Sequence, residues 1–300
     1  GMDYALDGTR AALHRADIAF CNLENPLTTK GTPIPNKQIW FQGDPTTVQV
    51  LQDGRFDVVS LSNNHILDYD SPGLLETFAV LDAAGVPSVG AGRNRAEAEL
   101  PTFVEVKGRR LAFLAYNQFA EIFWNWTYRR TFAATDTLPG NVPMLKERIL
   151  PAVASARGQA DLVVVYLHWG EEDQPHPLPE QRVLARAIVA AGADLLITSH
   201  VHVLQGIEAY RGKPILYSLG NFVFDQRRPR NVESMLAECV YAADGSVRLS
   251  IIPALIVEGQ PRVATGQEAV RLLQYLASLS RPLGTELTLV GERAELRLAR

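Results

Sequence analysis

The stretch Asp194-Leu195-Leu196-Ile197-Thr198-Ser199-His200-Val201-His202 joins a buried strand to a pair of imidazoles. Its apolar run is typical of a strand inside a sheet, and the two histidines follow where that run ends. In an extended backbone residues i and i+2 point to the same side, so we expect the rings of His200 and His202 to face one spot. Two imidazoles that converge at a strand end indicate a metal site, although an isolated His-x-His pattern is more often structural.

Three other apolar runs also end in potential metal ligands. They cover residues 18–21, 58–61 and 162–167, and they lead into Asn22-Leu23-Glu24, Asn63-Asn64-His65 and His168-Trp169-Gly170. Open α/β sheets place their sites at the carboxyl ends of strands, so we expect these side chains to converge. Two alternatives stay open: turn chemistry for Asn63-Asn64-His65, and a solvated loop acid for Glu24.

The expected ligands offer oxygen and nitrogen but no thiolate: Glu24, Asn64, His168, His200 and His202. Such a set suits zinc, manganese or iron, whereas calcium and magnesium prefer oxygen alone. In a two-metal hydrolase one carboxylate bridges ions about 3.5–4 Å apart, and the metals activate a bound water. Glu24 is the candidate for that bridge.

Strand and helix patterns alternate along most of the chain, which predicts a mixed α/β protein with two sheets in one domain. Ser71 as N-cap and Pro72 at the first helical position predict a helix that stops at Gly85. The expected helices cover residues 9–15, 45–52, 71–84, 143–157, 179–191 and 267–279. Strands are expected at 17–21, 56–61, 86–89, up to 167 and up to 199, and hairpins at 101–116, 203–219 and 233–257. Residues 286–300 fit a strand or a helix.

The composition is that of an ordinary globular protein. Over 300 residues the formal net charge is -4 with acids and bases interspersed, so nucleic acid is not an expected partner. No apolar run approaches the roughly 18 residues that span a bilayer. Cys21 and Cys239 lie in apolar runs far apart in the sequence, and we expect buried thiols rather than a disulfide.

Two further segments offer binding groups. Residues 117–142 suit a lid or a polymer platform, although packing is the favoured interpretation of their aromatic side chains. These are Phe119, Phe123, Trp124, Trp126, Tyr128 and Phe132. Asn221, in a tight turn after a strand, is a candidate for contact with a ligand near the metal. Arg227 and Arg228 are candidate substrate-binding residues, because guanidinium groups pair bidentately with phosphate and carboxylate. A solvated charged face is an equally good interpretation of the arginines.

Four motifs together resemble a known family. They are Asn22-Leu23-Glu24-Asn25-Pro26-Leu27, Ser62-Asn63-Asn64-His65-Ile66-Leu67-Asp68-Tyr69, His168-Trp169-Gly170-Glu171, and the run from Ala191 through His200-Val201-His202 to Tyr217-Ser218-Leu219-Gly220-Asn221-Phe222-Val223-Phe224. In this order they are similar to the bacterial capsule-synthesis CapA family, named for poly-γ-glutamate synthesis, within the calcineurin-like metallophosphoesterase superfamily. The resemblance covers residues 15–226. It implies a four-layer sandwich of two mixed β-sheets flanked by helices, with one domain over 1–260 and a packed extension over 261–300.

The resemblance also implies a divalent metal (Mn, Zn or Fe) and a place for each ligand. Asn64, His168 and His200 would share one metal, Glu24 would bridge, and His202 would belong to a second metal.

For the chemistry, the resemblance implies a metal-dependent, phosphoesterase-type hydrolase. His65 would protonate the leaving group or hold the phosphoryl oxygen. Asp68 lies at a spacing that suits orienting the His65 imidazole, or alternatively capping the next helix. The implied substrate is a phosphoester or an anionic polymer, and the implied partners are other capsule-synthesis membrane proteins.

One departure from the superfamily concerns the second metal. The superfamily begins with a strand that ends in Gly-Asp, and this chain has no apolar run leading into such a pair before Asn22. Either sequence upstream of Met2 is missing, or one metal site at most is occupied. The departure favours a rival function, a non-catalytic accessory that binds an anionic polymer during capsule assembly or export. Upstream sequence would imply cell-surface or membrane association, and otherwise we expect a cytoplasmic protein.

Overall fold

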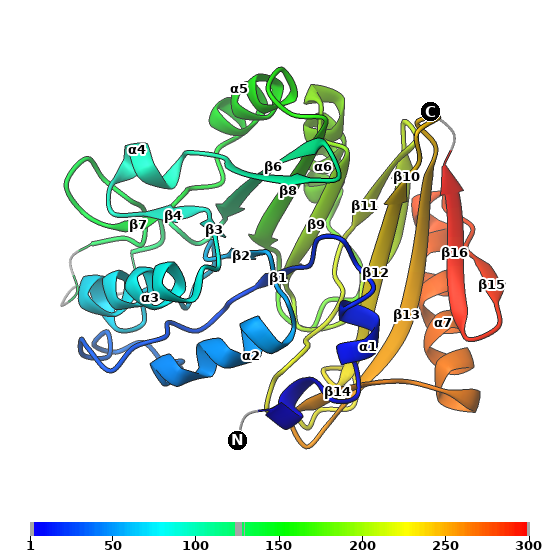
Figure 1. Ribbon diagram of the computed structural model, residues 1–300, viewed down its shortest axis with the longest axis horizontal. Helices are drawn as coiled ribbons and strands as arrows, with labels where there is room; N and C mark the ends of the chain where they lie inside the picture. Colours follow the sequence, from blue (N-terminus) through cyan, green and yellow to red (C-terminus); the bar gives the residue numbers. More distant parts are fainter. Residues whose placement is uncertain (1–2, 124–127, 129, 299–300) are drawn as a thin grey trace. The chain divides into compact units, whose positions relative to one another are not determined.

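The computed structural model describes residues 3–123, 128 and 130–298 of the chain (Figure 1). The chain forms two compact units. The first is built from Leu13–Trp169, and the second combines Tyr4–Ala12 with the chain from Gly170 onward. Two short helices come first in the sequence, η1 (Asp3–Leu6) and α1 (Arg10–Leu13).

The first unit contains three groups of strands. A parallel sheet has the order β1-β2-β3 (Phe20–Asn22, Val58–Ser60, Ser88–Val89). Strands β5 (Thr102–Val106) and β6 (Arg109–Asn117) form an antiparallel hairpin. The same sheet is extended by β8 (Leu162–Trp169), which pairs with β6 in parallel. A short antiparallel pair joins β4 (Ala91–Gly92) to β7 (Gly140–Asn141). The helices are η2 (Pro45–Thr47), α2 (Val48–Asp53), α3 (Asp70–Ala84), α4 (Arg95–Ala98) and α5 (Lys146–Arg157).

Parallel register brings the polar strand ends of this unit together. Asn22 at the end of β1 pairs with Ser60 at the end of β2, and Asn117 at the end of β6 pairs with His168 in β8. Strands β2 and β8 are largely apolar and buried, as the runs at 58–61 and 162–167 predict. The polar residues that follow β1 and β2 therefore start from one edge of a sheet, where loops can converge.

Helix α3 confirms the helix predicted over 71–84, and Gly85 ends it in the left-handed conformation at φ 69°. The predicted N-cap is wrong, because the helix begins at Asp70 and Tyr69 occupies the cap position. The Asp70 carboxylate accepts the adjacent Ser71 amide at 2.6 Å, and no side chain caps the start of the helix with a hydrogen bond. Helix α5 begins at Lys146 rather than 143, since Pro143 is held in a bridge to Asn117.

The second unit is rich in strands, as predicted after residue 200. Helix α6 (Pro179–Ala191) precedes three strands in the order β10-β11-β9 (Ile207–Tyr210, Lys213–Leu216, Leu195–His200). A second sheet has the order β12-β13-β16-β15 (Glu233–Tyr241, Val247–Val257, Arg293–Leu298, Thr288–Val290), and β14 (Gln260–Val263) pairs with β13. For residues 286–300 the sequence left strand and helix open, and the structure contains the strands β15 and β16 there.

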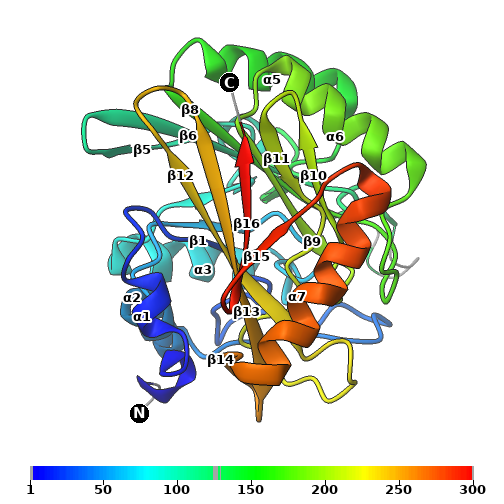
Figure 2. The same ribbon diagram turned by 90° about the vertical axis from the view of Figure 1, so that its right-hand side faces the viewer.

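Helix α7 (Gly266–Ser280) is followed by η3 (Arg281–Leu283) and runs beside the second sheet of its unit (Figure 2). Its buried face carries leucines and an alanine at helical spacing, which is the pattern that predicts a packed amphipathic helix. At its end, Ser280 Oγ accepts the Ile207 amide at 3.0 Å and fastens the helix to β10.

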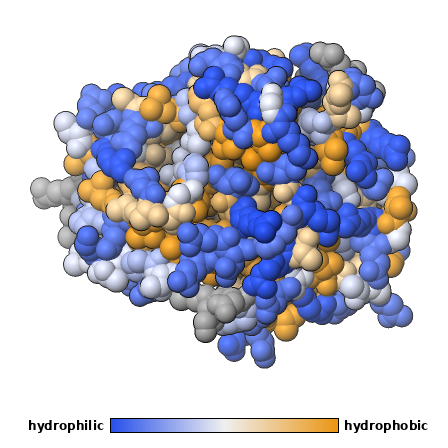
Figure 3. All heavy atoms as spheres, in the orientation of Figure 1, coloured by the Kyte–Doolittle hydropathy of each residue, from blue (hydrophilic) through white to orange (hydrophobic). Residues whose placement is uncertain are grey.

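The mixed α/β class is confirmed by these sheets and helices, while the four-layer sandwich and the boundary at residue 260 stay predictions. None of the described helices is long and apolar enough to cross a membrane. The face shown in Figure 3 is mostly hydrophilic, with hydrophobic side chains in small patches, as is usual for a globular surface.

Candidate metal site

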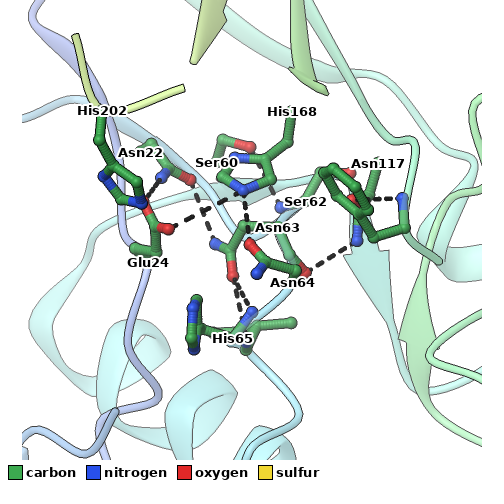
Figure 4. Close-up of polar contacts among 12 residues, drawn as sticks. Asn22, Glu24, Ser60, Ser62, Asn63, Asn64, His65, Asn117, His168 and His202 are labelled. Carbon is green, nitrogen blue, oxygen red and sulfur yellow. Dashed lines mark hydrogen bonds and ion pairs between the residues drawn. The ribbon is translucent and has the colours of Figure 1, made fainter. Parts of the chain in front are cut away.

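The ends of β1 and β2 place Glu24 in a network of asparagines (Figure 4). Asn22 Nδ2 donates to Glu24 Oε2 at 2.9 Å, and Asn63 Nδ2 donates to Asn22 Oδ1 at 3.1 Å. These bonds fix one carboxylate oxygen. The other, Oε1, is buried and has no hydrogen-bond partner among the described residues. A buried carboxylate oxygen without a donor is costly unless a cation or a water satisfies it.

His168 at the end of β8 faces the same point. It is fully buried, and its Nε2 lies 2.7 Å from Asn64 Oδ1 and 3.8 Å from Glu24 Oε1. Its Nδ1 lies 3.0 Å from Tyr166 Oη. As a hydrogen bond, the 2.7 Å contact requires Nε2–H to donate to Asn64 Oδ1. A metal would require the other tautomer, in which Nδ1 donates to Tyr166 Oη and the lone pair of Nε2 faces the cation.

The donor set of the first unit therefore fits a divalent cation. Glu24 supplies an unsatisfied carboxylate oxygen, Asn64 an amide oxygen, and His168 an imidazole nitrogen. Mixed oxygen and nitrogen donors of this kind suit zinc, manganese or iron. Within the described parts of the chain, no three His, Cys, Asp or Glu side chains are grouped to hold a metal. One of the expected ligands is an amide, and the full set stays a prediction.

Asn63 holds the loop that carries Asn64. Its side chain donates to Leu23 O at 2.9 Å and accepts the amides of His65 and Ile66 at 3.0 and 2.9 Å. Its carbonyl accepts two further side-chain amides, from Asn117 at 2.9 Å and Asn141 at 2.7 Å. Neither of these two asparagines was among the predicted site residues. Asn117 ends a strand, as the predicted ligands do, and could have been found by that pattern.

His65 is held by a buried ionic cluster. Its Nδ1 donates to Asp68 Oδ2 at 2.7 Å, and its ring stacks on Phe41 with centroids 4.0 Å apart. The other oxygen of Asp68 accepts a bond from Lys37 Nζ. Burial lowers the pKa of the Lys37 ammonium, and the Asp68 carboxylate partly opposes that effect. The alternative role of Asp68 as a helix cap is wrong, because Tyr69 occupies that position.

The two histidines of the second unit do not lie on extended backbone, so that premise is wrong. Strand β9 ends at His200, and both histidines have positive φ, 106° for His200 and 60° for His202. Such backbone is strained for residues other than glycine and is often found at functional sites. The rings nevertheless lie close, with centroids 6.1 Å apart.

Asn221 orients His202. Asn221 Oδ1 lies 2.8 Å from His202 Nδ1, and its Nδ2 donates to Asn231 O at 3.0 Å. That second bond fixes the amide, so Oδ1 accepts the Nδ1 proton and Nε2 carries the lone pair. Of the two candidate arginines, both are exposed, and Arg228 pairs with Asp173 at 2.9 Å.

The aromatic segment contributes packing beside the site of the first unit. Phe132 is fully buried, with Lys37 Nζ 5.4 Å from its ring centroid. Phe119 meets His168 edge-on at 6.2 Å, whereas Phe123 is exposed. Trp124 and Trp126 lie outside the described residues.

Comparison with known proteins assigns the chain to a family. Residues 1–226 match the family described as bacterial capsule synthesis protein PGA_cap. The chain belongs to this family. The resemblance to the capsule-synthesis CapA family expected from the four motifs is thereby confirmed.

Several relatives of this capsule synthesis family protein cover most of it. Capsule biosynthesis protein CapA of Bacillus anthracis is 34% identical over 272 residues, which are 88% of this chain and 64% of the relative. PGA biosynthesis protein CapA of Bacillus subtilis is 35% identical over 263 residues, 87% of this chain and 67% of the relative. A probable polyglutamine synthesis accessory protein of Mycobacterium tuberculosis is 30% identical over 228 residues, 74% of this chain and 59% of the relative. The chain thus spans about two thirds of the length of the first two relatives.

Proposed function

We propose that this member of the capsule synthesis family is a metal-dependent hydrolase of the phosphoesterase type. The observation that carries the proposal is the buried Glu24 Oε1, which has no hydrogen-bond partner among the described residues and faces His168 Nε2. Glu24, Asn64 and His168 would hold a divalent metal within the first unit, whereas His200 and His202 in the second unit remain ligands predicted from the sequence. A bound Mn, Zn or Fe ion would lower the pKa of a water and polarise the bond to be cleaved.

His65 would deliver the proton in this reaction. Since its Nδ1 proton is committed to Asp68 Oδ2 at 2.7 Å, Nε2 is the nitrogen through which it can give a proton to a leaving oxygen. Stacking on Phe41 fixes the plane of the ring. An imidazole held on one edge and one face keeps a single orientation, which a general acid requires.

The proposed cellular role is supported by the family and by the names of the relatives. Relatives named for capsule and PGA biosynthesis support a role in capsule or poly-γ-glutamate synthesis. The substrate would then be an anionic polymer or a phosphoester. Partners would then be other capsule-synthesis membrane proteins.

Metal content and hydrolysis test the proposal together. Elemental analysis of the purified protein would show bound Mn, Zn or Fe, and His168→Ala and Glu24→Gln would lower metal affinity about tenfold or more. His176→Ala is the matched control, because that histidine is exposed and outside the ligand set. Hydrolysis of bis-p-nitrophenyl phosphate would depend on added metal and on His65. Unchanged metal content in His168→Ala and Glu24→Gln would refute the site.

A second candidate function is a non-catalytic accessory that binds an anionic polymer. The exposed guanidinium groups of Arg227 and Arg228 favour it, because they can pair with carboxylates. In that case His65→Ala would bind polyglutamate as well as the wild type, and no hydrolysis would occur with Mn, Zn or Fe. Loss of binding in Arg227→Ala with Arg228→Ala would accompany this result.

A further inference from the structure

Lys37 lies in the long irregular segment between β1 and η2, yet its ammonium is buried. Its side chain is only 4% exposed. Nζ donates to Asn64 O at 2.6 Å and to Asp68 Oδ1, and it lies 3.2 Å from His65 Nδ1. Burying an ammonium is unfavourable unless it is paired and hydrogen-bonded, and here both conditions are met.

The ammonium joins two groups of the proposed site. One is the main chain of Asn64, whose side-chain oxygen lies 2.7 Å from His168 Nε2. The other is the carboxylate that holds His65. Asp68 Oδ2 accepts His65 Nδ1 and also the Phe41 amide at 2.7 Å, so Lys37 satisfies the oxygen that remains.

Without Lys37 the carboxylate would lose this arrangement. Asp68 is completely buried, and a buried carboxylate oxygen without a donor favours rotation, protonation or entry of water. Each of these changes would release the His65 ring from its single orientation. A neutral side chain of the same length cannot replace the positive charge. Another cationic side chain that reaches Asp68, such as arginine, can replace part of the interaction.

We propose that Lys37 is a positioning residue. Its ammonium joins Asp68 to the backbone of Asn64, and Asp68 in turn holds the proton-donating His65 in one orientation. The proposal rests on the hydrolase function for its kinetic consequence, but the orientation of His65 is a property of the folded chain. Lys37 itself acts through His65 and Asp68 and not on the substrate.

The test compares Lys37→Met with Lys30→Met at saturating metal. Lys30 is a matched control, because it lies in the same segment, is 67% exposed, and pairs with Glu76 only at 3.6 Å. We expect Lys37→Met to lower kcat about tenfold to a hundredfold with KM changed less than about threefold. The loss should be larger for a phenyl leaving group than for p-nitrophenyl, because the poorer leaving group depends more strongly on protonation by His65. In a His65→Ala background, Lys37→Met should add little.

A readout without catalysis separates this proposal from the proposed function. The imidazole resonances of His65, assigned with His65→Ala, should shift or broaden in Lys37→Met and keep their wild-type positions in Lys30→Met. Lys37→Arg should restore part of the wild-type spectrum, and Lys37→Gln serves as the neutral variant if Lys37→Met does not fold.

The outcomes then separate cleanly. Wild-type resonances of His65 in the neutral variants would overturn the proposal, as would a loss of kcat that is equal for both leaving groups and persists without His65. Perturbed resonances in a protein that hydrolyses nothing would support the positioning by Lys37 and reject the hydrolase.

Discussion

Asn63→Ala should destabilise the folded protein more than any exposed substitution. The Asn63 side chain is completely buried and makes four hydrogen bonds, which are donated to Asn22 Oδ1 and Leu23 O and accepted from the amides of His65 and Ile66. The backbone amides on one side and a backbone carbonyl on the other fix which end of the amide is nitrogen, so all four bonds belong to one orientation.

The magnitude follows from these four bonds. Each contributes about 1 kcal/mol net, and removal leaves their partners buried without replacement, so we expect a loss of about 3–5 kcal/mol in the free energy of unfolding. Asn63→Asp keeps the acceptor for the two amides but turns a carboxylate oxygen toward two carbonyl oxygens. It should therefore be destabilising as well, although it is nearly isosteric.

Urea unfolding followed by far-UV circular dichroism and by tryptophan fluorescence measures the loss. Asn25→Ala is the control, because Asn25 makes one long bond, 3.4 Å to Pro26 O, and should change the free energy by less than about 1 kcal/mol. If Asn63→Ala and Asn25→Ala unfold at the same urea concentration, the asparagine network does not hold the loop and the reasoning is refuted.

Three further predictions concern other parts of the two units. Gly90→Ala should lower the free energy of unfolding, measured by calorimetry, by about 2–4 kcal/mol, because φ is 84° and a Cβ would lie 2.6 Å from the Cβ atoms of Ser62 and Ala115. Gly85→Ala, where a Cβ meets open space, should lower it by about 1 kcal/mol. Glu208→Ala should lower the free energy of unfolding in urea by about 2–4 kcal/mol, since it removes the partner of Arg186 and of the buried Tyr217 hydroxyl. An unchanged urea midpoint would contradict this prediction. Burial raises the pKa of the Cys21 and Cys239 thiols from 9.0 to about 12, so at about pH 8 Ellman's reagent should react with both thiols in denaturant and slowly or not at all in the native protein.

Much of the candidate site could be predicted because its residues follow apolar strands. Apolar runs lead into Asn22, Asn64 and His168, and parallel pairing aligns β1 with β2 in one sheet and β6 with β8 in another. The same pattern was misleading for His200 and His202. The prediction assumed that the strand continued through both, but β9 ends at His200 and the chain turns with positive φ. The pattern of apolar residues predicts where a strand lies, but it predicts the last residue of the strand poorly.

Lys37 could not be predicted from any periodic pattern, since it lies 31 residues from Asp68 in a segment with no regular structure. The hydrogen-bonding needs of Asp68 would have pointed to it. Once Asp68 is assigned to orient a buried imidazole, one of its oxygens is used and the other remains, carrying much of a negative charge into the protein interior. Such an oxygen requires a donor, and a cation is the strongest one available. Residues 23–44, between β1 and η2, contain only Lys30 and Lys37 as cations. A predicted buried carboxylate with one oxygen still unassigned therefore calls for a donor, but only the structure shows that Lys37, and not Lys30, supplies it.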